Sequence, residues 1–178
     1  MANENGDEGR WEDVAADLDK ILDGMEMVGD ETFVYYDRAT GEVVGLREEY
    51  LLRAESELAG EEDLRSLTEW EEAEVDTGRA VLEDEAGRFV PLPDRFEIDE
   101  WDMMRRFSYQ VSDEELSGRL LDAIHGKGAF RRFKDTLYQA GIQEEWFEFR
   151  NQQYREIAEE WCEWKDIPVK EEAAQTDL

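Results

Sequence analysis

The pattern of apolar positions in the first half of the chain predicts one helix followed by a small sheet. Apolar side chains recur at three- and four-residue steps from Trp11 to Val28, which is the spacing of one helix face, and Gly29 follows as the expected stop. Two apolar runs, 33–36 and 42–46, then flank a short polar segment, and a third run at 88–93 contains two prolines. This pattern predicts two antiparallel strands joined by a turn, with a third strand at the sheet edge.

The polar segment between the first two strands contains Asp37, Thr40 and Gly41. Asp and Thr side chains commonly bond to nearby backbone amides in turns, and glycine accepts the positive φ that many turns require. We therefore interpret Asp37 and Thr40 as turn-forming residues, the alternative being that they are catalytic. A short helix is expected next, from residue 47 to residue 58.

The second half of the chain has helical periodicity throughout and predicts four helices. Their apolar stripes are Ile98, Trp101, Met104, Phe107 and Val111; Leu116, Leu120, Leu121 and Ile124; Phe130, Phe133, Leu137 and Ala140; and Trp146, Phe149, Ile157, Trp161 and Trp164. Ser112 and Glu115 have the spacing of a capping box for the second helix, and Gly141 ends the third. We interpret the aromatic row of the last helix as core rather than as a stacking surface.

Short links between these helices favour an antiparallel bundle. The two halves together predict an α+β fold: a small antiparallel β-sheet with an N-terminal helix, packed beside a C-terminal helical bundle of about four helices. The expected boundary follows the prolines. Residues 1–96 form the acidic N-terminal α/β part with a net charge of −20, and residues 97–178 form the bundle with −9. We expect the two parts to make one compact unit.

The chain is very acidic, with 49 Asp or Glu against 20 Lys or Arg in 178 residues and a net charge of −29. Such a surface repels polyanions except at a local basic patch, so neither general duplex DNA binding nor membrane binding is expected. Arginine outnumbers lysine by 15 to 5. An acid-rich, lysine-poor surface suits a high-salt cytosol, where screening relieves self-repulsion, and a halophilic adaptation is therefore a hypothesis.

The acidity is greatest between residues 55 and 85, which hold 13 acids and 2 bases. This composition predicts an acid-rich connector that is helical or partly disordered. Rows of carboxylates can also imitate nucleic-acid phosphates or bind calcium, although the segment lacks the spacing of a calcium loop. We interpret the segment as a solvated face, with an acidic nucleic-acid mimic as the alternative.

One stretch, residues 116–134, carries a net positive charge, unlike the rest of the chain. Five basic residues and one acid give it a net charge of +4, so the rest of the chain carries −33. Its centre is a Gly-Lys-Gly loop that is expected to be flexible, followed by a helix that begins near Ala129. The candidate anion-binding residues are His125, Gly126, Lys127, Gly128, Arg131, Arg132 and Lys134.

Clustered cations at a helix N-terminus cost free energy, because the helix dipole is already positive there, and an anion is therefore expected nearby. It is either an external anion such as phosphate, held by the loop amides and basic side chains, or a set of the chain's own carboxylates, beginning with Asp135. With 49 acids in the chain, our interpretation favours the internal carboxylates. The loop lacks the glycine spacing and the Ser or Thr of a Walker A loop.

Residues suited to catalysis are sparse. The chain has one histidine, His125, and one cysteine, Cys162, which excludes a multi-histidine metal site and an intramolecular disulfide. We interpret His125 as a cap on the preceding helix, the alternative being an acid or base beside a bound phosphoryl group, and Cys162 as a small buried residue. No cofactor and no metal are expected. Without a leader-like start or a long apolar run, the protein is expected to be cytoplasmic.

Several blocks of the sequence resemble a bacterial family of uncharacterised proteins, UPF0158. They are GKGAFRRFKD at 126–135, EWFEF at 145–149, IAEEW at 157–161 and, upstream, YDRATGEV at 36–43 and RFVPLP at 88–93. The likeness spans about residues 34–161, and its specific part is the GKGAFRRFKD block. The family carries no established activity, so the resemblance implies membership without implying a function.

Three functions are compatible with these features. The favoured one is a non-enzymatic binding or regulatory module that presents the basic loop and helix start to an anionic ligand, an RNA or a protein partner. The first alternative is an enzyme acting on a phosphorylated small molecule or nucleotide, with His125 or a carboxylate from 97–102 at the site. The second alternative is the acidic nucleic-acid mimic. Nothing in the sequence indicates the oligomeric state.

Overall fold

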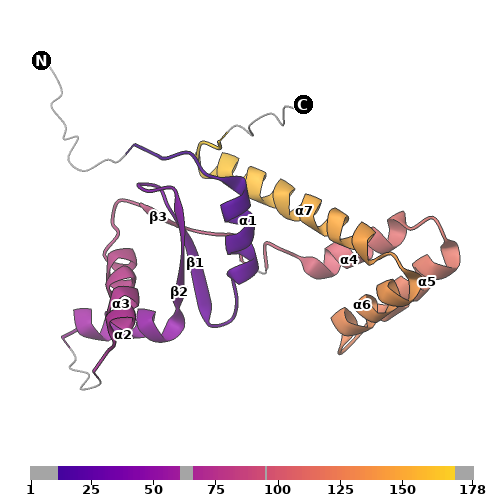
Figure 1. Ribbon diagram of the computed structural model, residues 1–178, viewed down its shortest axis with the longest axis horizontal. Helices are drawn as coiled ribbons and strands as arrows, with labels where there is room; N and C mark the ends of the chain where they lie inside the picture. The colour runs from indigo at the N-terminus through magenta and orange to yellow at the C-terminus, as the bar shows by residue number, and fades with distance from the viewer. Residues whose placement is uncertain (1–11, 61–65, 95, 171–178) are drawn as a thin grey trace, which may run out of the picture. The chain divides into compact units, whose positions relative to one another are not determined.

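The structure is a computed structural model that describes residues 12–60, 66–94 and 96–170 (Figure 1). These residues divide into two compact units, each with buried apolar side chains of its own. The first unit contains described residues of 12–94 together with 161–170, and the second contains residues 96–160. The predicted α+β class is confirmed. None of the helices in the described ranges is long and apolar enough to cross a membrane.

In the described part of the first unit, three strands form one antiparallel sheet in the order β2-β1-β3. The strands are β1 (Thr32–Asp37), β2 (Glu42–Arg47) and β3 (Phe89–Pro91). Tyr36 of the central strand lies opposite Val43 on one side and Val90 on the other. Aromatic and β-branched side chains pack well on such a pleated, half-buried surface. The predicted strands, turn and edge strand are confirmed.

A glycine lets helix α1 (Leu18–Met27) pack closely on one face of this sheet. Gly24 is buried, and a Cβ added there would lie 2.6 Å from Val43 Cγ1 and 2.6 Å from Leu92 Cδ1. Ile21 and Met25 are buried on the same side of the helix. The apolar stripe predicted from the sequence is therefore the docking face of α1.

The helix begins later than the apolar pattern predicted, and Trp11 lies outside the described residues. The described residues before the helix are not helical, and Ala16 forms a parallel bridge with Val169. Because this segment pairs its backbone with a segment distant in the sequence, it does not join the helix. Asp17 caps α1 instead, accepting from the Asp19 N–H at 3.2 Å.

Two further helices of the first unit pack against each other and against β2 (Figure 1). They are α2 (Glu48–Leu58) and α3 (Glu69–Leu82), and the buried cluster beside the sheet consists of Leu46, Tyr50, Ala54 and Val75. Helix α3 belongs to the acid-rich segment that was expected to be a connector. This part of the acid-rich segment is thus a packed helix with an acidic outer side. Residues 61–65 of the segment lie outside the described ranges.

The second unit is built from helices around an aromatic centre. Its helices are α4 (Glu100–Gln110), α5 (Glu114–Ala123), α6 (Ala129–Ala140) and α7 (Gln143–Trp164) up to residue 160. The ring centroid of Trp146 lies 5.4 Å from that of Phe107 and 4.9 Å from that of Phe133, both in edge-on contacts. Such contacts add to the burial of the rings, so the predicted aromatic core is confirmed at these positions.

Two details of these helices differ from the predictions. The cap of α5 is Asp113 rather than Ser112, because the Asp113 carboxylate accepts from the Leu116 N–H at 3.0 Å and also complements the helix dipole. Trp164 is 72% exposed, since α7 ends at this residue, so it is not part of the core. Trp161 of the same stripe is buried and packs edge-on against Tyr36 within the first unit.

Candidate anion-binding site

The loop between α5 and α6 holds two glycines in the left-handed conformation. Gly126 has a φ of 73° and Gly128 a φ of 79°. Gly128 is the N-cap of α6 and has no side chain to accept from the first N–H groups of the helix. The Ala129 N–H donates a hydrogen bond to Gly126 O at 3.3 Å. Because a residue with a Cβ rarely adopts such φ values, the chain needs glycine at both positions to build this loop.

Arg132 closes the loop from within α6. Its Nη1 donates to Lys127 O at 2.6 Å, and its Nη2 donates to His125 O. Backbone carbonyls in a short loop are obligatory acceptors, and the planar guanidinium reaches two of them at once. Arg132 therefore shapes the loop, with two of its donors directed at the protein's own backbone.

The other three basic candidates point into solvent. Lys127, Arg131 and Lys134 are exposed, and neither they nor Arg132 form an ion pair with any carboxylate in the described ranges. Asp135, which we expected as the first internal partner, makes no such contact. The Lys134 ammonium lies 4.6 Å from the centroid of the Phe130 ring. The fold thus gathers these cations on one loop and the helix that follows it.

His125 lies at the start of the loop and is exposed. The C-cap of α5 is Ile124 rather than His125, and the His125 N–H donates to Asp122 O at 3.4 Å. Its imidazole has no hydrogen-bond partner among the residues that the structure describes. The expected capping role is therefore carried by the backbone and not by the imidazole.

Trp101 is a residue of this site that the sequence did not reveal. Its indole Nε1 donates to Ile124 O at 3.0 Å, so α4 holds the first residue of the loop. The apolar pattern assigned Trp101 to the core, but its side chain is 45% exposed. A tryptophan among four acids at a helix start was the available signal, since indole N–H groups usually find an acceptor when partly buried.

The acids at the start of α4 are engaged in structural contacts. Asp99 caps the helix, and Asp102 forms an ion pair with Arg105. Glu100 Oε1 accepts from Arg150 Nη2 of α7 at 2.8 Å. These are three of the four carboxylates at 97–102 that the enzyme alternative could use, the fourth being Glu97, and the contacts of these three connect or cap helices of the second unit.

Asp37, for which a catalytic role was the alternative to a turn-forming one, is a buried carboxylate that accepts four hydrogen bonds. Arg88 donates to both of its oxygens at 2.7 Å, the Thr40 hydroxyl donates at 2.9 Å, and the Ala39 N–H donates at 3.0 Å. Burial raises the pKa of Asp37, but the hydrogen bonds from its three partners outweigh that effect and hold the pKa below its ordinary value. The turn interpretation of Asp37 and Thr40 is confirmed.

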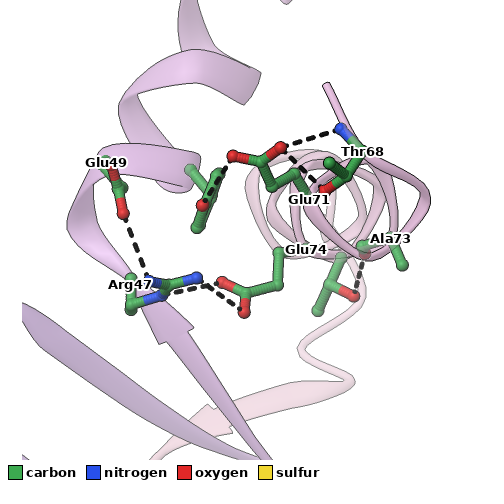
Figure 2. A network of polar contacts seen from close by, with 8 residues as sticks. Arg47, Glu49, Thr68, Glu71, Ala73 and Glu74 are labelled. Carbon is green, nitrogen blue, oxygen red and sulfur yellow. Dashed lines mark hydrogen bonds and ion pairs between the residues drawn. The ribbon is translucent and has the colours of Figure 1, made fainter. Parts of the chain in front are cut away.

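A second polar network joins β2 to the two helices beside it, as Figure 2 shows. Arg47 at the end of β2 contacts Glu49 at 3.4 Å and Glu74 of α3 at 3.3 Å. Its guanidinium also lies 4.6 Å from the ring centroid of Tyr50 and 5.1 Å from that of Trp70. The hydrogen bonds that Arg47 donates to the Glu74 carboxylate raise the pKa of Arg47 above its ordinary value. This network ties α3 to the sheet and is structural in character.

The described ranges contain no group of three or more His, Cys, Asp or Glu side chains placed to hold a metal ion. Cys162 is 1% exposed, as its position in an aromatic stripe predicted. The basic loop with the start of α6 is therefore the candidate site that the geometry best supports.

Comparison with known proteins adds a family. A family model described as "Uncharacterised protein family (UPF0158)" matches residues 13–177. The chain is also similar to a UPF0158 protein of Pseudomonas aeruginosa, with 25% identity over 100 residues that make up 56% of this chain and 65% of the relative. The matched part is thus less than two thirds of that relative's length. No solved structure matches the chain.

Proposed function

Because the chain belongs to the uncharacterised protein family UPF0158, whose description names no activity, we propose its function from the geometry of the basic loop. We propose a non-enzymatic binding module that presents residues 124–128 and the start of α6 to an anionic partner. Lys127, Arg131 and Lys134 make the contacts, while Arg132 keeps the loop in the shape that exposes them.

The observation that carries this proposal is three exposed cations without a carboxylate partner among the residues that the structure describes, in a chain with 49 acids in all. Lys127 and Arg131 also adjoin the positive end of the α6 dipole, which makes their clustering unfavourable in isolation. An external anion at this place relieves both effects at once. The loss of this repulsion on binding contributes favourably to the free energy of binding the partner.

The construction of the loop supports the same reading. Arg132 and Trp101 each bond to loop carbonyls, and two left-handed glycines fix the course of the backbone. A loop held in this way loses little conformational entropy when a partner binds, so more of the interaction energy appears as affinity. We therefore regard the loop as a preorganised surface rather than as a flexible link.

The enzyme alternative receives less support from the contacts around the loop. Three of its four carboxylates, Asp99, Glu100 and Asp102, are engaged in a helix cap and in ion pairs, as described above. His125 would have to act without a hydrogen-bonded partner among the described residues to orient its imidazole. Binding requires only the cations that the loop exposes, and it is the simpler proposal.

A thermal-shift titration tests the proposal. The wild-type chain is melted with phosphate, pyrophosphate, polyphosphate, nucleotides or RNA at constant high chloride, which keeps general salt effects fixed. A ligand at a hundred times its Kd adds about 2.7 kcal/mol to the free energy of unfolding, which raises the melting temperature by roughly 5–10 °C in a chain of this size. At least one anion is expected to give such a shift.

The matched variants are Arg131→Glu and Arg106→Glu. Both replace an exposed arginine of the second unit and change the net charge equally, but Arg106 lies on α4, away from the loop sequence. The shift should disappear in Arg131→Glu and persist in Arg106→Glu. If no anion shifts the wild type, or if both variants lose the shift equally, the proposed site is rejected. Turnover of a shifting ligand would favour the enzyme instead.

A further inference from the structure

We infer that the anionic partner is a single-stranded nucleic acid, bound along the face of α6 that combines cations with an exposed tyrosine; this inference rests on the function proposed above. Arg131, Lys134 and Tyr138 are spaced by three and four residues on α6, so their side chains leave the helix on one side, about one turn apart. Lys127 precedes this face in the loop. The face therefore offers charge at one end and a flat ring at the other.

Tyr138 is the residue that separates nucleic acid from other anions. Its side chain is 77% exposed, whereas tyrosine usually buries much of its ring. Its ring contacts no other aromatic ring and no cation in the part of the chain that the structure describes. Stacking of a base on an exposed aromatic ring is tolerant of sequence, because every base has a π-face.

Phe130 and Lys134 form a second element of the same face. The Lys134 ammonium is held 4.6 Å from the Phe130 ring centroid, and Phe130 is itself 37% exposed. This cation–π contact restricts a long lysine side chain, so less of its freedom is lost when the ammonium meets a phosphate. Lys134 lies one helical turn from Tyr138, which lets one strand place a phosphate and a base on the face together.

The combination of cations with an exposed aromatic ring on this face of α6 discriminates among anionic macromolecules. An acidic peptide supplies carboxylates for the cations but no flat ring for Tyr138. A duplex supplies phosphates, but the faces of its bases are hidden in the stack. Unpaired nucleotides supply a phosphate and an accessible base within the span of the face. They are therefore the partner that uses every exposed group on it.

The net charge of −29 sets a limit on the strength of this binding. The distant acids of the chain repel a polyanion, but at physiological ionic strength the Debye length is about 8 Å, so they are largely screened while direct contacts are not. Few cations are available to release counterions from the strand. The structure therefore fits a short strand bound at one face rather than a long polyanion wrapped around the chain.

Fluorescence anisotropy of the full chain with three labelled probes tests the inference. The probes are a short oligouridylate, the same length of RNA duplex, and an oligoglutamate peptide, all at one chloride concentration. The single strand is expected to bind most tightly. Tyr138→Ala should weaken its binding about tenfold, while Tyr138→Phe, which keeps the ring, should bind within twofold of wild type.

The matched control is Tyr109→Ala. Tyr109 is a tyrosine of α4 in the same unit with 67% exposure, and its loss should leave binding of the single strand unchanged. If the peptide or the duplex binds as tightly as the single strand, or if Tyr138→Ala binds it like wild type, the nucleic-acid inference is overturned while the proposed anion site stands. If none of the three probes binds, the nucleic-acid inference is overturned, and the thermal-shift titration with phosphate and pyrophosphate then decides separately whether the proposed anion site stands.

Discussion

Asp37 shows how much of a single residue's role is local and how much is not. Its bonds to the Ala39 N–H and the Thr40 hydroxyl involve the next three residues, and the turn pattern predicted contacts of this kind. Its strongest partner, Arg88, lies 51 residues further along the chain. No local pattern indicates that partner, because the pairing of β1 with β3 brings the two side chains together.

At the residue scale we predict that Asp37→Asn lowers the free energy of unfolding by about 2 kcal/mol at pH 7. The substitution removes the charge from a set of charge-assisted hydrogen bonds, which contribute about 1.5–3 kcal/mol, and the Arg88 side chain is 39% exposed and stays hydrated. Urea unfolding of both proteins measures the difference. A variant as stable as wild type at pH 7 would show that Arg88 and the turn amides gain nothing from the charge.

The same pair predicts a pH dependence. The pKa of Asp37 is lower in the folded chain than its ordinary value of 3.8, so the folded state favours the carboxylate. This stabilisation is present above the ordinary pKa and is lost as the pH falls through the folded pKa. The stability difference between wild type and Asp37→Asn should therefore shrink between pH 7 and about pH 3. The other acids are common to both proteins, so an undiminished difference at pH 3 would contradict the assigned pKa direction.

At the scale of elements, the loop between α5 and α6 was predicted in composition but not in geometry. The glycines predicted a loop, and the cations near a helix start predicted a nearby anion. Arg132 turns inward because the folded loop presents two carbonyls to it, and those acceptors do not exist until the glycines adopt a positive φ. A run of basic residues in the sequence does not distinguish an arginine that bonds the loop backbone from one, such as Arg131, that is directed into solvent.

Two glycine substitutions test this account of the loop. Gly128→Ala should lower the free energy of unfolding by about 1–2 kcal/mol, because alanine disfavours the left-handed conformation, and its Cβ would also approach Arg132 Nη1 to 3.3 Å. Gly118→Ala in α5 should raise it by up to about 1 kcal/mol, since alanine is the better helix former and nothing lies within 4 Å of the new Cβ. Chemical unfolding of both variants provides the measurement. Equal effects would contradict the geometry.

At the scale of the whole molecule, the sequence predicted the class of the fold better than its long-range pairing. Periodicities of two and of three to four residues identified the strands and most helices, because these depend on neighbours in the chain. The described residues before α1 share the helical pattern but are not helical, since Ala16 pairs with Val169. Hydrophobic spacing records which side of an element is buried, and it contains no information about a partner segment so far away.

The net charge gives a prediction for the molecule as a whole. With 49 acids and 20 bases, the chain carries an excess of negative charges that repel one another in the compact state. Added salt screens that repulsion. The melting temperature should therefore rise steeply as NaCl increases to about 0.5 M and level off near 1 M, where the Debye length is about 3 Å. Thermal melts followed by circular dichroism measure this. A melting temperature that is flat over this range would reject both self-repulsion as a major term and the halophilic hypothesis.

The pairing of the two ends of the first unit also has a consequence for synthesis on the ribosome. Ala16 accepts from the Lys170 N–H at 2.8 Å and donates to Pro168 O at 2.7 Å, and Arg38 donates to Lys165 O at 2.6 Å. Ala16 and Arg38 thus lack these partners until residues 165–170, which are synthesised later, have emerged. The second unit, residues 96–160, is continuous in the chain, so it can fold as soon as its own residues have emerged. The earlier-made unit is therefore the one completed later.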